Sequence, residues 1–190
     1  MAKVIPAAEF IPVEAELRDG RRVTLRAVRP RDREELQAAI KRLSPEARYT
    51  RFMSPLRELA PDMLQRAVSP EQNCELQLVA VTGSAPAQTI VGGARYSAAA
   101  DSRVCEFALA IADDWQGVGL ARRLLEVLMR TARRRGFETM EGYVLASNTR
   151  MLGLARRLGF TRSPSGEGPA VCLVRCDLEK WEQASFPAGQ

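Results

Sequence analysis

Apolar residues recur along the chain with two different periods, which predict strands in its middle part and helices on both sides. Alternation of apolar with polar or small residues, typical of half-buried strands, runs through residues 75–83, 89–98 and 103–111. Short stretches that favour turns separate these segments, so we predict an antiparallel meander. An earlier pair of alternating segments meets at Asp19 and Gly20, a sequence typical of a hairpin turn.

Apolar residues three and four positions apart predict helices before and after the meander. Ser44 and Pro45 are typical of a helix cap and a first helical residue. The expected helices span residues 31–43, 45–53, about 60–68, about 118–135 and about 148–158. Strands are expected at 139–146 and 170–178, and a loop at 163–169.

This order of elements indicates an α+β fold in one domain. A chain of 190 residues buries enough surface for one substantial core. We expect the domain over residues 12–180, after an extension of residues 1–11 and before a loose tail of residues 181–190.

Composition excludes several classes of chemistry. The chain has no histidine, so acid–base chemistry must use Asp, Glu, Tyr, Cys or Lys, and most zinc sites are excluded. The cysteines form no C-x-x-C pair, which favours reduced thiols over a metal site or a disulfide; they are Cys74, Cys105, Cys172 and Cys176. No run of 18 apolar residues and no secretory signal is present, so we expect a cytoplasmic protein without a membrane span.

The net charge of +5 favours an anionic partner, such as nucleic acid, a membrane surface or a phosphorylated cofactor. The positive charge is almost all arginine and is spread along the chain, and aromatic residues make up only 6%. A nucleic-acid partner is not expected, because nucleic-acid binders concentrate basic residues and use aromatic side chains to stack bases.

Two glycines stand directly before the helix expected from about residue 118. In the segment WQGVGLARRLL, residues 115–125, Gly117 and Gly119 remove the side chains that would keep a ligand from the backbone. The first turn of a helix has unpaired N–H groups and a partial positive charge, which favour phosphate. The same glycines also fit a simple turn, and neither the dinucleotide pattern nor the P-loop pattern is present.

Glu106 is a charged residue in an otherwise apolar strand. Alternation places it on one face with Val104, Ala108 and Ala110. A buried carboxylate needs a partner, so Glu106 either faces a cleft or forms an ion pair. If the turn near residues 99–102 pairs residues whose numbers add up to about 201, Arg95 lies opposite Glu106 and can form this ion pair. Glu106 can also both face a cleft and pair with Arg95.

Several segments resemble the GNAT superfamily of N-acetyltransferases. Gln116, Gly119 and Ala121 match its Q/R-x-x-G-x-G/A signature, with alanine where glycine is more usual. LRAVRPRDREELQAAIKRLSPEARYTRF, CEFALAIADDWQGVGLA and NTRMLGLARRLGF are similar to the acetyltransferase domain of bacterial Pat-type protein lysine acetyltransferases, over about residues 12–178. The resemblance implies the GNAT fold, with a mixed, mostly antiparallel sheet flanked by helices.

The resemblance also implies acetyl-CoA as co-substrate and assigns residues to it. The pyrophosphate would lie on the loop Gln116, Gly117, Val118, Gly119, Leu120 and Ala121, with Arg122 beside it. The pantetheine arm would lie at the strand end at Ile111. Asn148 would touch the cofactor arm or only cap its helix, with Ser147 as a rival cap.

Glu106 matches the family's general base for direct attack of an amine on the thioester. Many members also have a tyrosine that protonates the departing thiolate, but Ala155 stands at that position here. Water, another group or no specific acid would then serve, and the sequence does not choose among Tyr49, Tyr96 and Tyr143.

The function implied is an acetyl-CoA-dependent N-acetyltransferase that modifies protein lysines, with an acceptor protein such as an acyl-CoA synthetase. Two alternatives remain open at this point. One is a small-amine acetyltransferase acting on a polyamine, an amino acid or an aminoglycoside, and the other is a CoA-binding sensor without turnover.

Overall fold

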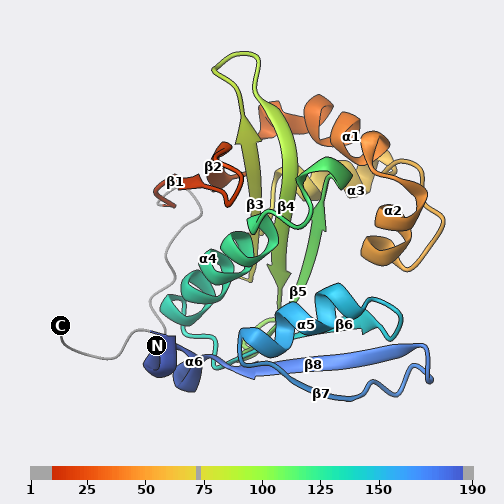
Figure 1. Ribbon diagram of the computed structural model, residues 1–190, viewed down its shortest axis with the longest axis vertical. Coiled ribbons are helices and arrows are strands. Elements are labelled where there is room, and N and C mark those ends of the chain that lie inside the picture. Colours follow the sequence, from red (N-terminus) through yellow and green to blue (C-terminus); the bar gives the residue numbers. More distant parts are fainter. Residues whose placement is uncertain (1–9, 72–73, 186–190) are drawn as a thin grey trace.

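The computed structural model describes residues 10–71 and 74–185, in which one mixed sheet of eight strands is flanked by helices (Figure 1). The strands are β1 Val13–Glu16, β2 Arg22–Ala27, β3 Glu75–Thr82, β4 Thr89–Ser97, β5 Val104–Ile111, β6 Thr139–Leu145, β7 Thr161–Pro164 and β8 Val171–Asp177. The helices are α1 Arg33–Arg42, α2 Pro45–Phe52, α3 Pro61–Val68, α4 Leu120–Arg134, α5 Thr149–Arg157 and α6 Leu178–Ser185.

The strand order is β1-β2-β3-β4-β5-β6-β8-β7, and each neighbouring pair is antiparallel except β5 and β6. The α+β class, the hairpin between β1 and β2 and the meander β3–β5 are therefore confirmed. The parallel pair β5–β6 is joined by α4, as a crossover between parallel strands requires.

Two hydrophobic cores cover the two faces of the sheet. The smaller core packs α1 and α3 against β3 and β4, through residues that include Leu36, Ile40, Leu64, Val79 and Val81. The larger core buries one face of α4 completely, through Leu120, Leu124, Leu125, Leu128, Met129 and Ala132. This apolar stripe, with arginines on the opposite side of α4, is the spacing that predicted the helix.

The C-terminal part of the chain differs from the sequence prediction. The tail predicted from residue 181 is helical as far as Ser185, because α6 is anchored by Trp181, which is 6% exposed. Asp177 Oδ1 accepts from the N–H groups of Glu179 and Lys180 and orders the first turn of α6. Residues 1–9 of the predicted extension and 186–190 of the predicted tail lie outside the described residues.

The loop predicted at 163–169 begins inside strand β7. All four residues of β7 are exposed, and in the described chain the strand pairs with β8 at one edge of the sheet. An edge strand with both faces in solvent shows no alternation of apolar residues, so its sequence carries no strand signal.

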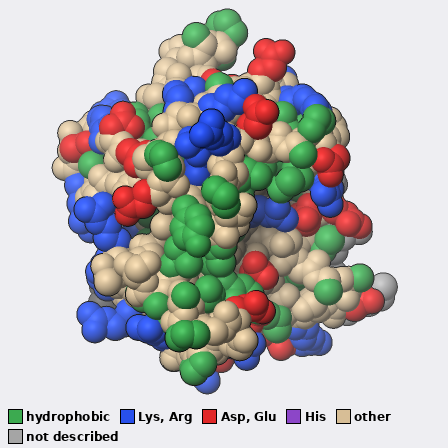
Figure 2. Space-filling model, turned by 90° about the vertical axis from the view of Figure 1, so that its right-hand side faces the viewer, with side chains coloured by type: hydrophobic (Ala, Val, Ile, Leu, Met, Phe, Trp, Pro, Cys, Tyr) green, Lys and Arg blue, Asp and Glu red, His purple; other side chains and the backbone are tan. Residues whose placement is uncertain are grey.

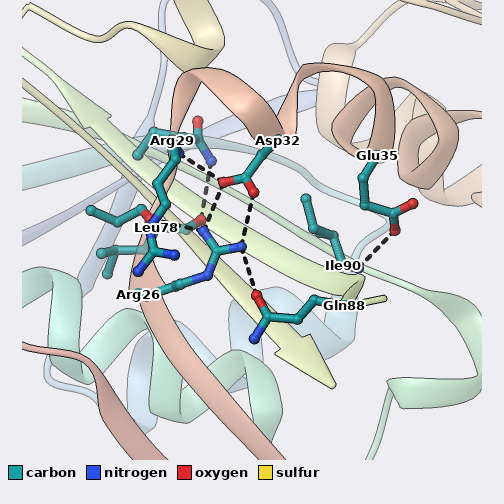
Figure 3. Close-up of polar contacts among 9 residues, drawn as sticks. Arg26, Arg29, Asp32, Glu35, Leu78, Gln88 and Ile90 are labelled. Atoms are coloured by element: carbon teal, nitrogen blue, oxygen red, sulfur yellow. Dashed lines mark hydrogen bonds and ion pairs between the residues drawn. The ribbon is translucent and has the colours of Figure 1, made fainter. Parts of the chain in front are cut away.

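A buried ion pair joins β2 to the start of α1 (Figure 3). Arg26 Nη1 and Nη2 donate to the two carboxylate oxygens of Asp32 at 2.7 and 2.9 Å, and the two residues are 4% and 7% exposed. Arg29 N also donates to Asp32, and Gln88 from the β3–β4 connection accepts from Arg26. Burial alone would raise the pKa of Asp32, but these hydrogen bonds and the arginine charges outweigh it and lower the pKa.

Candidate active site

A long cleft of about 1620 Å³ lies between α2 and the pair formed by β6 and α5, with β5 as its floor. The 3₁₀ turn after β5 and the start of α4 line the cleft along with these elements. Figure 2 faces the side of the molecule that carries α2 and shows a hollow bordered by hydrophobic side chains. The cleft is the candidate active site, because the predicted site residues gather along it.

The floor of the cleft exists because β5 and β6 separate. Their parallel pairing covers three residue pairs, from Val104 to Glu106 on β5. Beyond these, the ring of Phe107 lies where a side chain of Gly142 would be, since a Cβ there would come within 2.6 Å of the ring. Glycine at 142 leaves room for this ring, and because the pairing ends at Glu106, the β5 edge from 107 to 111 has no pairing to β6 and lines the cleft.

The loop between β5 and α4 has the backbone geometry that the glycines permit. Gly117 and Gly119 have φ angles of +78° and +97°, in the left-handed region that favours glycine. Gly119 is the N-cap of α4, and its left-handed φ keeps it outside the helix, which therefore begins at Leu120 and not at about residue 118 as predicted. A Cβ at Gly117 would meet nothing within 4 Å, so the backbone there is open to a ligand.

Gln116 joins this loop to the end of β5. Its side-chain amide donates to the carbonyl of Ile111 at 3.4 Å and accepts from Arg150 at 3.3 Å. Arg122 in the first turn of α4 forms an exposed ion pair with Glu126 at 2.7 Å. The structure therefore brings these predicted residues together along the cleft, although the side chain of Leu120 lies in the core and leaves only its backbone to face a ligand.

Arg18 is a cleft residue that the sequence analysis missed. It lies in the β1–β2 turn, its N–H donates to the carbonyl of Val118 at 3.1 Å, and its side chain passes 3.7 Å from the Cβ position of Gly119. The residue adds positive charge beside the glycine loop. About one hundred positions separate it from that loop, and no local pattern connects the two.

Asn148 caps α5, so the structure confirms its predicted role as a helix cap. Its side-chain oxygen accepts from the N–H of Met151 at 3.0 Å, so Asn148 and not Ser147 is the cap. Asn148 also lines the cleft, and its amide nitrogen can still donate to a ligand. The contact with the cofactor arm stays a prediction.

Glu106 is exposed on the floor of the cleft, as one of the two alternatives predicted, and the other alternative, an ion pair with Arg95 directly opposite, is wrong. Glu106 lies opposite Ser97, whereas Arg95 lies opposite Ala108 and forms an ion pair with Glu75 at 3.1 Å. The turn is centred one residue later than expected, where Asp101 adopts a left-handed φ of 60°. The opposite residue on β4 is therefore a serine.

Arg51 on α2 is the charged group that faces Glu106 from across the cleft. Burial, and to a smaller extent the nearby charge of Arg95, lower the pKa of Arg51 to about 10, while the charge of Glu106 opposes this shift. Arg51 and Glu106 both line the cleft. The sequence analysis missed Arg51 because packing of α2 over β5, not a motif, brings it to the site.

The structure separates the three tyrosines left open as acids. Tyr96 is fully buried under α4, its hydroxyl accepts from Arg135 at 2.9 Å, and burial raises its pKa to about 12. Tyr49 and Tyr143 line the cleft, while Ala155 is buried in α5. Tyr96 is therefore excluded as the acid, and Tyr49 and Tyr143 remain.

The cysteines are free thiols, and burial raises the pKa of Cys105 to about 12 and that of Cys176 to about 11. Within residues 10–71 and 74–185, no group of three or more acidic or cysteine side chains is arranged to hold a metal ion. No helix in the described part of the chain is long and apolar enough to cross a membrane.

Comparisons with known proteins point to one family. The family model described as an acetyltransferase (GNAT) domain matches residues 22–161. Acetyltransferase PA5475 of Pseudomonas aeruginosa is 38% identical over 159 residues, which cover 81% of this chain and 86% of that protein. The crystal structure of the GNAT domain of S. lividans PAT has a TM-score of 0.80 and 26% identity, covering 87% of this chain and 96% of that one. A spermidine N-acetyltransferase SpeG chimera from Vibrio cholerae and hSSAT, at 19% identity and a TM-score of 0.66, covers 84% of this chain and 97% of its own and shares the fold.

Proposed function

Because the chain belongs to the GNAT acetyltransferase family, we propose that it transfers the acetyl group of acetyl-CoA to lysine side chains of an acceptor protein. The chain is an acyltransferase with the GNAT fold, and acetyl-CoA is its co-substrate. The acceptor, the residue roles and the extent of the domain, residues 12–180, belong to the proposal. A cytoplasmic location is also part of the proposal, and the free thiols support it.

The glycine loop is proposed to hold the pyrophosphate of acetyl-CoA. The open backbone at Gly117, the uncapped first turn of α4 and the nearby Arg18 together form a positive surface for phosphate oxygens. The free edge of β5 up to Ile111 presents peptide groups to the pantetheine arm. Asn148 at the start of α5 is proposed to contact the same arm.

Glu106 is proposed as the general base. A lysine amine with a pKa near 10.4 must lose a proton before it attacks, at a cost of roughly 5 kcal/mol at neutral pH. In the proposed step Glu106 accepts that proton directly or through water, the amine nitrogen bonds to the thioester carbon, and the carbon–sulfur bond breaks. Coenzyme A leaves as a thiolate, which Tyr49, Tyr143 or water protonates.

The observation that carries a protein acceptor is the open apolar rim of the cleft. Tyr49 and Met53 on α2 and Tyr143 on β6 are 48%, 37% and 36% exposed, and all three line the cleft. Large exposed apolar side chains around a site are typical of surfaces that bind another protein. A small amine is expected to bind in a more enclosed site that buries most of the ligand's surface.

The acceptor class is tested by assaying thiol release from acetyl-CoA with an acyl-CoA synthetase, a lysine peptide and spermidine. We expect the synthetase to be the best acceptor, with the modified lysine located by mass spectrometry. Turnover with spermidine alone would replace the protein acceptor by a small amine. Binding of acetyl-CoA without turnover by any acceptor would favour a sensor.

Replacement of the rim residue Met53 is expected to affect only binding of the protein acceptor, because Met53 has no proposed role in the chemistry. Met53→Ser should raise KM for the acceptor protein by about tenfold, because it removes an exposed apolar contact, while KM for acetyl-CoA is unchanged. Ile11→Ser, which removes an apolar side chain that is 81% exposed and outside the cleft, is the matched control. Equal effects of both variants would contradict docking at the rim.

Replacement of Gly119 by glutamate is expected to weaken acetyl-CoA binding by at least 100-fold. The variant places a carboxylate beside the proposed phosphate site and forces a left-handed φ on a residue with a side chain. Gly20→Glu is the control for strain alone, since Gly20 has a φ of 83° and open space around it. Unchanged calorimetric affinity in a folded Gly119→Glu protein would remove the assignment.

A further inference from the structure

A second cavity of about 320 Å³ adjoins the cleft and lies between the sheet and helices α1 and α3. Arg51 and Phe52 of α2 and Ala108 and Ala110 of β5 line both the cavity and the cleft, so the two spaces lie side by side at these residues. We call this cavity the side chamber.

The chamber exists because the sheet carries very small residues beneath it. Gly93 of β4 pairs with Ala110 of β5, and the next inward-facing pair is Arg95 with Ala108. The roof is formed by apolar residues of α1 and α3, among them Leu36, Ala39, Ile40, Met63 and Ala67. Gly93, Ala108 and Ala110 in the floor thus leave a space that larger strand residues would fill.

The roof is fixed at its distance from the floor. Glu35 of α1 accepts from the N–H of Ile90 at 2.8 Å, and Arg42 donates to the carbonyl of Ile90 at 3.1 Å (Figure 3 shows the first of these). Arg42 is also paired with Glu35 at 2.7 Å. Because these bonds tie α1 to β4, the helix cannot settle onto the small residues and close the chamber.

Charge in the chamber is confined to groups that already have opposite charges near them. Arg95 is paired with Glu75, Arg66 is paired with Asp62, and Arg51 faces Glu106. Beside Gly93 the side-chain amide of Gln77 already donates to the carbonyl of Leu78, and the lining contributed by α1 around Leu36, Ala39 and Ile40 is apolar. The chamber therefore suits an uncharged hydrocarbon group better than a charged one, since a second charge there would lose hydration without a partner.

We propose that the side chamber binds the hydrocarbon chain of acyl-CoA donors longer than acetyl-CoA, such as butyryl-CoA and hexanoyl-CoA. This rests on the proposed position of the donor along β5, which places the acyl group next to Ala108 and Ala110. An acyl chain that extends from that point enters the chamber, whereas an acetyl group leaves it empty. Each methylene buried there raises affinity by up to about fourfold.

The test measures calorimetric binding of non-transferable thioether analogues of acetyl-CoA and hexanoyl-CoA, without any acceptor. We expect the hexanoyl analogue to bind at least tenfold tighter. Ala39→Leu, which adds bulk to the chamber roof, should remove this advantage and leave the affinity for the acetyl analogue unchanged. Ala38→Leu on the same helix is the matched control, because Ala38 is half-buried but does not line the chamber.

Ala67→Leu on α3 is a second chamber variant if Ala39→Leu does not fold. Equal affinity of the two analogues for the natural protein would overturn the proposal, as would equal effects of Ala39→Leu and Ala38→Leu. A chain-length effect without lysine acetylation would support the chamber and contradict the proposed acceptor. Failure of both analogues to bind would instead contradict the donor position and, with it, the chamber.

Discussion

Glu106→Gln is expected to lower turnover with a lysine acceptor by about 100-fold or more at neutral pH, and to retain acetyl-CoA binding. Glutamine keeps the size of the side chain and its hydrogen bonding but cannot accept the proton of an ammonium group. The rate that remains should rise with pH, as solvent takes over deprotonation of the amine. Stopped-time assays of thiol release across the pH range, together with calorimetry of acetyl-CoA binding, measure both quantities.

A purely structural role of Glu106 would give a different result. Its charged neighbour is Arg51, so loss of this interaction would lower the melting temperature and leave turnover per folded molecule nearly intact. Glu141→Gln is the matched control, because Glu141 occupies the paired position on β6 but is held by Arg175 at 2.6 Å. If Glu106→Gln melts early yet turns over normally, Glu106 is not the base.

Asp32→Asn is expected to lower the free energy of unfolding by about 3–5 kcal/mol, because it leaves the buried charge of Arg26 without its partner. Urea denaturation followed by circular dichroism measures the loss. Asp62→Asn is the control, since Asp62 forms an exposed ion pair with Arg66 at 3.2 Å. That change should cost less than about 1 kcal/mol. Similar losses for both variants would contradict a special role for the buried pair.

The stabilisation by Asp32 is expected to depend on pH with a definite sign. The pKa of Asp32 is lowered in the folded protein, so its contribution is complete above the unfolded pKa near 3.9 and is lost as pH falls through the lower folded value. The difference in stability between the natural protein and Asp32→Asn should therefore be constant near neutral pH and shrink below about pH 4. A difference that shrinks at higher pH would assign the effect to another group.

Elements with a strong repeating pattern could be predicted from the sequence. The helix after Gly119 and the meander were predicted from the spacing of their apolar residues, because this spacing indicates which side of each element faces the core. The alternation in β5 also placed Glu106 on the face away from Phe107, and the structure confirms this separation. A residue's face within its own strand is a local property.

Properties that depend on two distant segments could not be predicted. A shift of the β4–β5 turn by one residue replaced Arg95 by Ser97 as the residue opposite Glu106, and local propensity carries too little energy to choose between such registers. Arg18 and Arg51 reach the cleft only when β1–β2 and α2 pack against the middle of the chain.

The side chamber also depends on segments that are distant in the sequence. Gly93, Ala108 and Ala110 form no local sequence pattern, and pairing of β4 with β5 brings them together under α1. Helix α6 and strand β7 likewise depend on tertiary contacts, the first on burial of Trp181 and the second on pairing with β8. The sequence thus specifies the faces of its elements through local periodicity, whereas register, cavities and the neighbours of each charge arise from long-range packing that no single segment encodes.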